Sequence, residues 1–244
     1  MTQLNKHSKK IIPALKAAFP LTIPVLTGYL FLGMGFGILL GSQDKGYGLF
    51  WTLLMSLIIF AGSMQYAAVG ILAAQASLVQ TAIMTLLINA RHLFYGLSMI
   101  EKYKDTGKKK LYLIFGLTDE TYSLLSSYKV PDGIEKGWFY FFVTLLNHCY
   151  WIAGCCIGNL IGTNVSFNSD GIEFVMTALF VVLFIDQWMQ AKNHLPALTG
   201  LLAAVGCLLL FGADNFIIPA MLIILVLLSI FRKPIESEKQ SHGF

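Results

Sequence analysis

The sequence predicts an all-α polytopic membrane protein, a transmembrane helical bundle of about seven membrane segments with at least one discontinuous or re-entrant helix. Of its 244 residues, 56% are hydrophobic and only 12% are charged, and the mean hydropathy is +0.69. This is too little charge to coat a soluble domain of this size. The hydrophobic runs follow one another with short polar breaks, so we expect a single domain over residues 1–244.

A basic segment, residues 1–17, precedes the first hydrophobic run. That run is too long for a signal peptide and lacks a small-residue cleavage site, so we expect it to remain as a membrane helix. Between Leu21 and Gly41 it is rich in Gly and Pro, which either pack against another helix or unwind around a site. The net charge of +4 comes from lysines beside hydrophobic ends, which favours a role in topology over nucleic-acid binding.

The second run, Leu49 to Ala74, is long for one crossing, and small and polar residues interrupt it from Phe60 to Tyr66. Such an interruption is typical of a discontinuous helix, whose freed backbone groups can bind a substrate when they face a cavity. The alternative is a continuous helix that packs through Gly62 and Ser63. Gln65 needs a polar partner at this depth in either case.

The third run, Ser77 to Ile100, contains Asn89, Arg91, His92 and Tyr95. In a straight helix Arg91 lies roughly 13 to 20 Å from either end of the run. An arginine at that depth normally faces a protein interior or a watery cavity. The i, i+3 spacing places Asn89 and His92 on one face, and the i, i+4 pair Arg91 and Tyr95 lies beside it. The sequence therefore predicts one polar side on this helix.

Basic residues set the expected topology. Residues 101–110 carry five lysines and two acids, so the positive-inside rule places this loop in the cytoplasm, together with the N-terminus and the polar tail 234–244. Three full crossings would place the loop outside, so we expect one run to be re-entrant, with Phe60 to Tyr66 as the turning point. The alternatives are an exoplasmic N-terminus or a misleading lysine count.

The next segment, Leu111 to Tyr128, is weakly hydrophobic and has Thr118, Asp119 and Glu120 near its centre. Two adjacent carboxylates do not face lipid. The segment is therefore either a short cavity-lining element or one that lies at the membrane interface, and a solvated turn is the alternative.

A full span is expected from Gly137 to Ile161, with Asn147 and His148 near its middle. A lone membrane histidine is more often a packed hydrogen-bond donor between helices than part of a proton relay. Two stretches of the sequence resemble each other: Thr-Leu-Leu precedes both Asn89 and Asn147, and a glycine follows each asparagine seven residues later. This echo indicates either an inverted repeat, which is common in transporters, or chance in a leucine-rich chain.

The C-terminal part continues with a span from Ile172 to Gln190, which carries Asp186 and Gln187 toward its expected cytoplasmic end. The last two runs, residues 195–212 and 216–231, are expected to form a short helical hairpin.

Known catalytic motifs are missing from the sequence. It contains no H-E-x-x-H, G-x-S-x-G, P-loop or cysteine metal motif, so we expect no enzyme activity, cofactor or metal. Opposite charges in an apolar bundle suit a small zwitterion, and hence an amino acid. The rivals are an intramembrane protease that uses Asp119 and Asp186, and a membrane assembly protein, which does not explain Arg91 beside three acids.

Four motifs occur in order, namely FAGSMQ at 60–65, NARHLFYG at 89–96, TDE at 118–120 and DQ at 186–187. Together they resemble the AzlC family of branched-chain amino acid exporters. The resemblance implies a large subunit that exports valine, leucine, isoleucine or their analogues across the cytoplasmic (inner) membrane. It also implies a small hydrophobic partner subunit of the AzlD type.

These motifs also carry the predicted site. We expect Arg91 to engage the substrate carboxylate or to hold Asp119 or Glu120, one of which couples transport to protons. The predicted substrate-binding residues are Gly62, Ser63, Gln65, Asn89, Arg91, His92 and Tyr95. The predicted residues for proton coupling or ion pairing are Asp119, Glu120, Asp186 and Gln187.

Overall fold

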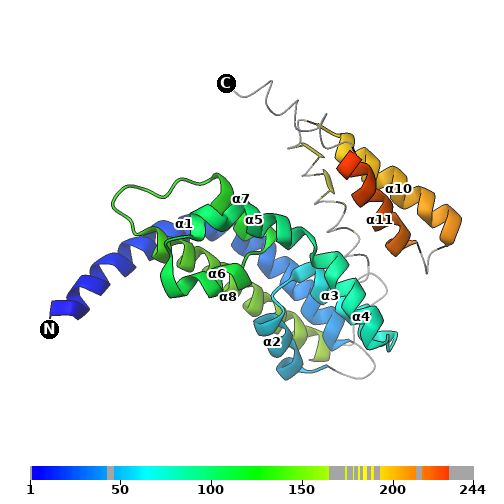
Figure 1. The fold of residues 1–244 in the computed structure, drawn as a ribbon. Helices are drawn as coiled ribbons and strands as arrows, with labels where there is room; N and C mark the ends of the chain where they lie inside the picture. The colour runs from blue at the N-terminus through cyan, green and yellow to red at the C-terminus, as the bar shows by residue number, and fades with distance from the viewer. Residues whose placement is uncertain are drawn as a thin grey trace. The chain divides into compact units, whose positions relative to one another are not determined.

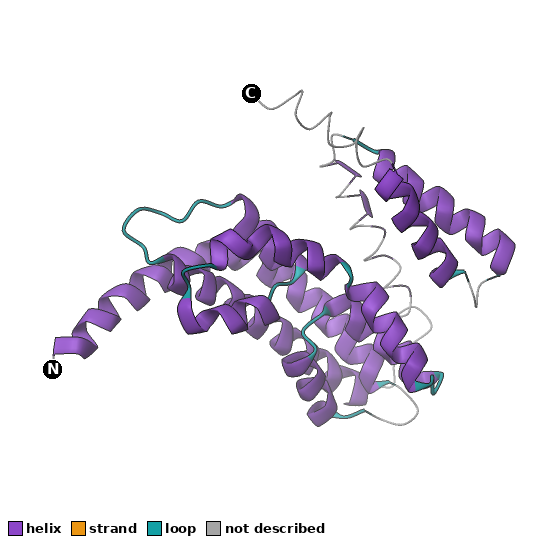
Figure 2. Ribbon diagram, in the orientation of Figure 1, coloured by secondary structure: helices purple, strands orange, loops and turns teal. Residues whose placement is uncertain are grey.

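The computed structural model describes residues 2–42, 47–164, 174, 178, 181, 184–185, 188–189, 193–212 and 216–230. Every regular element in these residues is a helix, as predicted (Figure 2). The chain divides into two compact units, Met1–Met176 and Thr177–Phe244, which we describe separately. The single domain expected over residues 1–244 stays a prediction.

The first unit is built on two long helices, α1 (Thr2–Gly41) and α8 (Lys136–Asn164), which lie side by side (Figure 1). Both are long and apolar enough to span a membrane. One further pair of helices qualifies if it counts as a single bent span, so the described residues contain two or three candidate spans. The expected total of about seven is not confirmed and stays a prediction.

Glycines bring α1 and α8 into backbone contact. A side chain on Gly33 would meet Cys155, and one on Gly41 would meet Asn159, so the two helices run in parallel. Such close approach through small residues is typical of helix packing in membranes. Of the two roles considered for the glycines of the first run, helix packing is therefore the one observed. Further glycines that approach the backbone of the other helix are Gly37, Gly154, Gly158 and Gly162.

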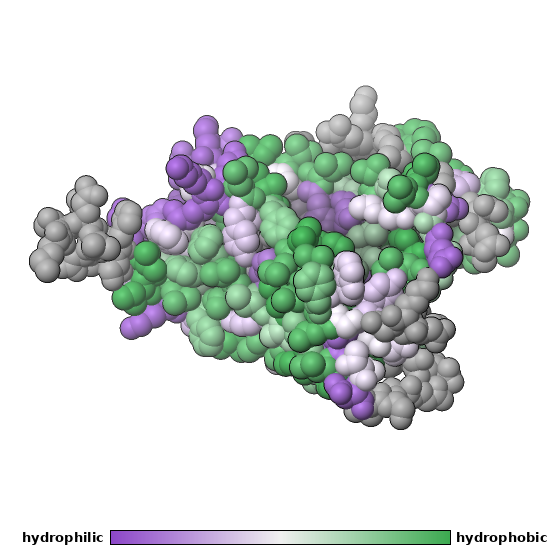
Figure 3. Space-filling view, turned by 90° about the horizontal axis from the view of Figure 1, so that it is seen from below, coloured by the Kyte–Doolittle hydropathy of each residue, from purple (hydrophilic) through white to green (hydrophobic). Residues whose placement is uncertain are grey.

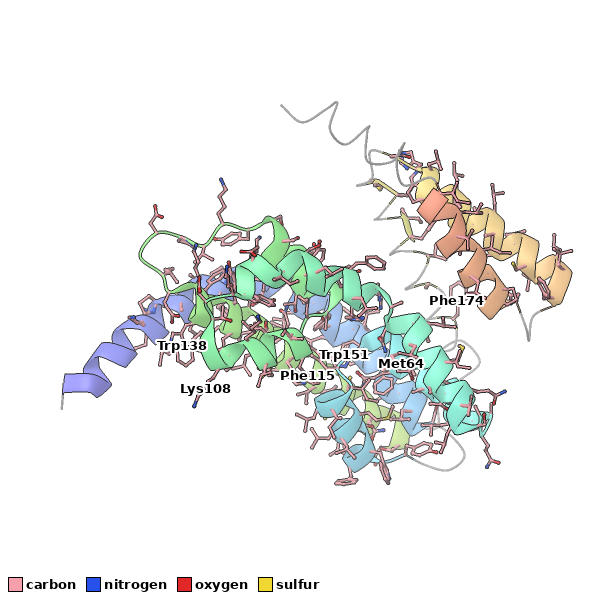
Figure 4. The ribbon with its side chains drawn as sticks, viewed as in Figure 1. Met64, Lys108, Phe115, Trp138, Trp151 and Phe174 are labelled. Atoms are coloured by element: carbon pink, nitrogen blue, oxygen red, sulfur yellow. The ribbon has the colours of Figure 1, made fainter. Side chains whose placement is uncertain are left out.

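The two ends of this pair serve as reference points for the other helices. We call the end with Ala14 and Tyr140 the basic end, because the lysine-rich loop lies there: Lys109 Nζ is 3.9 Å from Oε1 of Glu135, which directly precedes α8. The opposite end, where Gly41 closes α1, is the glycine end. Figure 4 shows Lys108 and Trp138 toward the basic end and Trp151 farther along α8.

The helices α2 (Leu49–Ile58) and α3 (Gly62–Ala73) form a first hairpin that enters from the glycine end. Close to the start of α2, the Asn159 side-chain amide donates to the Tyr47 carbonyl at 2.8 Å. On the return, Val69 of α3 packs in one apolar cluster with Leu39 and Leu40. The first hairpin therefore makes no net crossing.

The tip of the first hairpin is Phe60, which has a φ of 40° and stacks on His148 with 4.0 Å between ring centroids. The break therefore covers residues 59–61 and precedes Gly62. The predicted interruption from Phe60 to Tyr66 therefore extends too far, because Gly62 to Gln65 are helical. Those residues form the first turn of α3, because the Gln65 amide already donates to the Ala61 carbonyl in helical fashion.

A second hairpin enters from the basic end. It follows the 3₁₀ turn η1 (Gly107–Lys109) and consists of α6 (Lys110–Phe115) and α7 (Asp119–Ser127). Its tip spans residues 116–118, where a side chain on Gly116 would overlap Thr144 of α8. On the return, Leu125 joins the apolar cluster that contains Ala14. The segment does not cross, and its tip lies beside the first, because the Phe60 and Phe115 ring centroids are 6.3 Å apart.

Between the hairpins, α4 (Leu78–Asn89) and α5 (Arg91–Tyr103) form a bent span with an angle of 46° at Ala90. The run from Ser77 to Ile100, whose depth we estimated for a straight helix, is thus divided at Ala90. The Ala90 amide bonds to the Leu87 carbonyl three residues back rather than four, which tightens the turn and redirects the helix. Arg91 consequently begins a helix instead of lying inside one.

The path of the chain agrees with the expected re-entrant run, with its turning point at the tip of the first hairpin. The bent span ends where Met99 and Tyr103 pack with Ala14, so the lysine-rich loop lies at the same end as the basic N-terminal segment. Residues 49–103 and 110–164 have equal length, and each consists of a hairpin followed by a crossing in the opposite direction. The echoing Asn89 and Asn147 lie on these two crossings, as an inverted repeat requires.

The second unit contains α10 (Leu195–Phe211) and α11 (Ile217–Ile230), which pack together as the predicted hairpin (Figure 1). Phe184, Trp188 and residues of both helices line a mostly apolar cavity of about 600 Å³. Asp186 and Gln187 lie outside the described residues, as does most of the expected span 172–190.

Large apolar side chains cover the outside of the helices. Phe31 and Leu86 are each 72% exposed, and the face in Figure 3 is largely hydrophobic. An apolar outer surface of this kind suits lipid rather than water. The composition and the structure therefore agree on a membrane protein.

Candidate functional site

Arg91 lies at the start of α5 and reaches the tips of both hairpins. Its Nη2 donates to the Ser63 hydroxyl in the first turn of α3, and its Nη1 lies 2.7 Å from Asp119 Oδ2 in the first turn of α7. All three residues lie at helix N-termini, which are the positive ends of helix dipoles. Met64, Trp151 and Phe115 mark this region in Figure 4. Three elements far apart in the sequence thus build one polar site.

The ion pair between Arg91 and Asp119 is half made, in the sense that it uses only one oxygen of the carboxylate and leaves one guanidinium nitrogen unbonded in the part of the chain that the structure describes. Among the described residues, Arg91 Nε and Asp119 Oδ1 have no hydrogen-bond partner although both atoms are shielded from solvent. Asn89 Oδ1, two residues before Arg91, is in the same state. Buried polar atoms without a partner are costly, and more so when they are charged. The site therefore holds one unused donor and two unused acceptors for a ligand that carries both charges.

A second polar chain begins at Glu120, next to the ion pair. The Tyr29 hydroxyl lies 2.6 Å from Glu120 Oε2 and 2.7 Å from the Thr118 hydroxyl. Thr118 donates to the Thr121 hydroxyl at 3.1 Å, which also accepts from the Asn147 amide at 3.0 Å. These five groups connect the second hairpin to both α1 and α8.

The solvated turn that we considered for the centre of the segment Leu111 to Tyr128 is wrong. Thr118 is 6% exposed and Thr121 is fully buried. Thr118 is also the N-cap of α7, since its hydroxyl accepts from the Thr121 amide at 3.3 Å. The turn is therefore part of the interior.

Gly62 and Gln65 hold the first hairpin against α8. Gln65 is fully buried, and its side-chain carbonyl accepts from the Trp151 indole at 2.8 Å. A side chain on Gly62 would come within 3.1 Å of the same indole. Both residues therefore contact α8 rather than the ion pair.

His92 and Tyr95 connect the bend to the second hairpin. His92 Nδ1 lies 3.2 Å from the Asn89 carbonyl oxygen, and its ring meets Tyr95 edge to face at 5.8 Å. Tyr95 stacks on Tyr122 of α7 at 4.4 Å. This aromatic ladder lies beside the ion pair.

The structure thus brings part of the predicted site together. Ser63, Arg91 and Asp119 are in direct contact, and Glu120 joins them through its neighbour Asp119. Asn89, His92 and Tyr95 surround the bend, whereas Gly62 and Gln65 lie against α8. The described residues contain no cluster of three or more His, Cys, Asp or Glu that could hold a metal ion.

His148 has the packing role that is usual for a lone membrane histidine. Its Nε2 lies 3.1 Å from the Ser56 carbonyl, which the end of α2 leaves without a helical partner. Because a carbonyl only accepts, Nε2 carries the hydrogen, and Nδ1 accepts from the Tyr112 hydroxyl at 3.0 Å. His148 therefore satisfies the broken end of α2.

Sequence reasoning missed Tyr29 and Trp151. Each is a polar-tipped aromatic residue inside an apolar run, and a buried Tyr hydroxyl or Trp indole normally finds a hydrogen-bond partner. That signal was visible in the sequence. The identity of the partners, Glu120 and Gln65, depends on how the helices pack.

Comparisons with known proteins agree with these motifs. The family described as AzlC protein matches residues 24–165. The branched-chain amino acid transport protein AzlC of Bacillus subtilis (strain 168) is 52% identical over 240 residues, which cover 98% of this chain and 93% of the relative. A membrane protein of Haemophilus influenzae is 43% identical over 242 residues, which cover 99% and 98%. The inner membrane protein YgaZ of Escherichia coli is 25% identical over 199 residues, which cover 78% and 80%. No solved structure matches significantly.

The matched residues 24–165 contain both hairpins, the bent span and α8, and therefore the whole of the polar site. The match covers more than half of the chain, and the Bacillus subtilis relative aligns over nearly its full length. The chain belongs to the AzlC family of membrane proteins.

Proposed function

We propose that this protein is a secondary transporter that exports branched-chain amino acids across the cytoplasmic membrane, coupled to protons, together with a small hydrophobic subunit of the AzlD type. The name of the Bacillus subtilis relative supports the substrate class, and that of the Escherichia coli relative supports the location. Within this chain the proposal rests on one observation, the half-made ion pair between Arg91 and Asp119.

An α-amino acid fits the unused atoms of this pair. Its carboxylate accepts from Arg91 Nε, and its ammonium group donates to Asp119 Oδ1 and Asn89 Oδ1. The helix N-termini of α3 and α5 favour the carboxylate. Phe60, at the tip of the first hairpin, and Met64, next to Ser63 in the first turn of α3, supply apolar contact for a branched side chain.

Arg91 then has both of the roles considered from the sequence. Without substrate it holds Asp119 and Ser63 through its two terminal nitrogens. With substrate it adds a bond from Nε, so it keeps the hairpin tips together and binds the carboxylate at the same time. Substrate binding thereby adds a bond at the residue that joins the two hairpin tips.

The rival readings gain no support from these contacts. A protease would need Asp119 as one of two catalytic carboxyls, but Asp119 is bound to Arg91. A purely structural role leaves the unpaired atoms of both polarities unexplained. The transport name of a relative that is 52% identical also favours the carrier.

Reconstituted vesicles that contain labelled valine test the proposal. Arg91→Gln and Asp119→Asn should each reduce valine exchange about 10-fold or more, because each removes one partner of a half-buried charge pair that the substrate is proposed to bridge. Asp105→Asn removes an exposed acid and should leave exchange unchanged. Size-exclusion profiles in detergent should show that all three variants are folded.

Unchanged valine exchange by both site variants would overturn the assignment. Vesicles prepared with and without a co-purifying small subunit test the partner, and an imposed pH gradient tests the coupling. Cleavage of a membrane peptide without valine movement would instead support the protease.

A further inference from the structure

We infer that Glu120 is the proton-binding residue of the transport cycle, and that Tyr29, Thr118 and Thr121 form a hydroxyl relay that transmits its protonation state to Asn147 on α8. The inference rests on the proposed function, in which transport is coupled to protons. From the sequence, either Asp119 or Glu120 could couple transport to protons, and the inference assigns this role to Glu120.

Geometry separates Asp119 from Glu120. Asp119 Oδ2 lies 2.7 Å from Arg91 Nη1, so this acid already has a cationic partner. Glu120 has no cation within salt-bridge distance in the described part of the chain, and its side chain meets the Tyr29 hydroxyl instead. A carboxyl group whose partner is a hydroxyl can be bonded in either charge state, since a hydroxyl both donates and accepts.

The relay follows from a count of hydrogens. Three oxygen-to-oxygen contacts, from Glu120 through Tyr29 and Thr118 to Thr121, need one hydrogen each. When Thr118 donates to Thr121 and Tyr29 donates to Thr118, the hydrogen between Glu120 and Tyr29 has to come from a protonated Glu120. When Glu120 is ionised, Tyr29 donates to it, and the hydrogens farther along have to rearrange.

Asn147, at the α8 end of this relay, has a side-chain oxygen that is free to accept a hydrogen bond within the described part of the chain. Asn147 is fully buried, its amide nitrogen donates to Thr121, and its Oδ1 has no hydrogen-bond partner among the described residues. Thr144, one turn earlier on α8, also has a buried hydroxyl without such a partner. With Glu120 protonated, Thr121 accepts from Thr118 and its own hydrogen is free to turn toward α8, whereas with Glu120 ionised that hydrogen returns to Thr118. Protonation of Glu120 thus changes how the second hairpin is held.

The charged and titratable groups around Glu120 link it to the substrate. They are Tyr29 on α1, Arg91 and Tyr95 on α5, and Asp119 on α7. Substrate binding redistributes charge on Arg91 and Asp119, which directly precedes Glu120 in the chain. Proton and substrate affinities are then coupled, and by linkage the coupling is reciprocal.

A zwitterion carries no net charge, so a cycle that moves one proton with each substrate moves one positive charge. Proteoliposomes test this with labelled valine. The wild-type protein should exchange valine without a gradient and should accumulate it roughly tenfold per unit of imposed pH gradient. A potassium diffusion potential set with valinomycin should change that accumulation.

Glu120→Gln should lose accumulation in response to both gradients, and the valine exchange that it retains should no longer depend on pH. Glu101→Gln alters an exposed glutamate and should behave as wild type. Tyr29→Phe keeps the ring, removes the relay hydroxyl and should flatten the pH profile of exchange. Tyr128→Phe, on a half-exposed ring that stacks on Phe139, is its matched control.

Infrared difference spectra between acidic and alkaline pH give a readout that does not need transport. A band from a protonated carboxyl should be present in the wild type and absent in E120Q. Gradient-driven accumulation by E120Q, or an unchanged infrared band, would overturn the inference. Wild-type exchange without any response to pH would overturn it and leave the carrier assignment intact, whereas a wild type that neither exchanges nor accumulates valine would remove both.

Discussion

The α1–α8 pair and the bent span α4–α5 are held in the first unit by different forces. The glycines of α1 and α8 bring the two backbones into contact along their length. On the bent span, α4 has no buried residue, and α5 buries only Met99 and Tyr103. Its polar attachments include the bonds of Arg91 to Ser63 and Asp119 at the bend and those of Lys102 to two carbonyls of the second hairpin at its end. One region is thus fixed by packing and the other by exchangeable polar bonds.

This difference separates stability from transport. Backbone packing has no alternative partner, whereas a ligand can compete for the bonds of an arginine. Changes in the α1–α8 contact should therefore lower the free energy of unfolding. Changes at Arg91 should mainly remove transport. Three further substitutions test this difference, and we give them in order of decreasing expected loss of stability, from the α1–α8 pair to the end of the bent span.

The largest effect on stability is expected for Gly37→Ala. The added Cβ would overlap the Cys155 carbonyl oxygen and the backbone near Gly158, neither of which is a flexible side-chain end. Overpacking of this kind should lower the free energy of unfolding by about 3 kcal/mol. Thermal unfolding in detergent measures the loss.

Gly28→Ala is the matched control on the same helix, because its Cβ would meet nothing within 4 Å. It should be neutral or stabilising by up to about 1 kcal/mol, since Ala is the better helix former. Equal losses from Gly37→Ala and Gly28→Ala would show that close packing does not hold the pair.

A smaller effect is expected for His148→Phe, which changes the contact between α8 and the tip of the first hairpin. The variant keeps an aromatic ring against Phe60 but leaves the Ser56 carbonyl and the Tyr112 hydroxyl without their partner. One buried group left unsatisfied costs about 1–3 kcal/mol. Cys149→Ala, at an exposed neighbouring position, should have almost no effect on the melting temperature.

The smallest effect is expected for Lys102→Met at the end of the bent span. The Lys102 ammonium donates to the Leu125 and Ser126 carbonyls, at 2.5 and 2.6 Å, near the C-terminus of α7. A cation at a helix C-terminus contributes about 0.3–1 kcal/mol. Lys104→Met, on an exposed neighbour, should change the melting temperature less, and the reverse order would contradict this role.

The sequence by itself determined the features that depend on local composition. Apolar runs predicted helices, and the small and polar residues after Phe60 predicted a break within one residue of where α2 gives way to α3. Lysine counts predicted that the N-terminus and the loop 101–110 share one end. These properties follow from the need to hydrogen-bond the backbone within the membrane and from the charge of the loops. Both depend mainly on the composition of each segment.

Only the tertiary structure decided the rest. The bend at Ala90 carries no Pro or Gly signal, since its neighbours are Asn89 and Arg91. The sequence placed Arg91 at depth but left its partner open among several acids, and it gave no reason to join Tyr29 to Glu120. Those choices depend on parallel packing of α1 and α8, which brings two opposed hairpin tips to the same depth. Contacts between residues so distant in the chain are set by the shapes of the packed helices, which local sequence patterns do not encode.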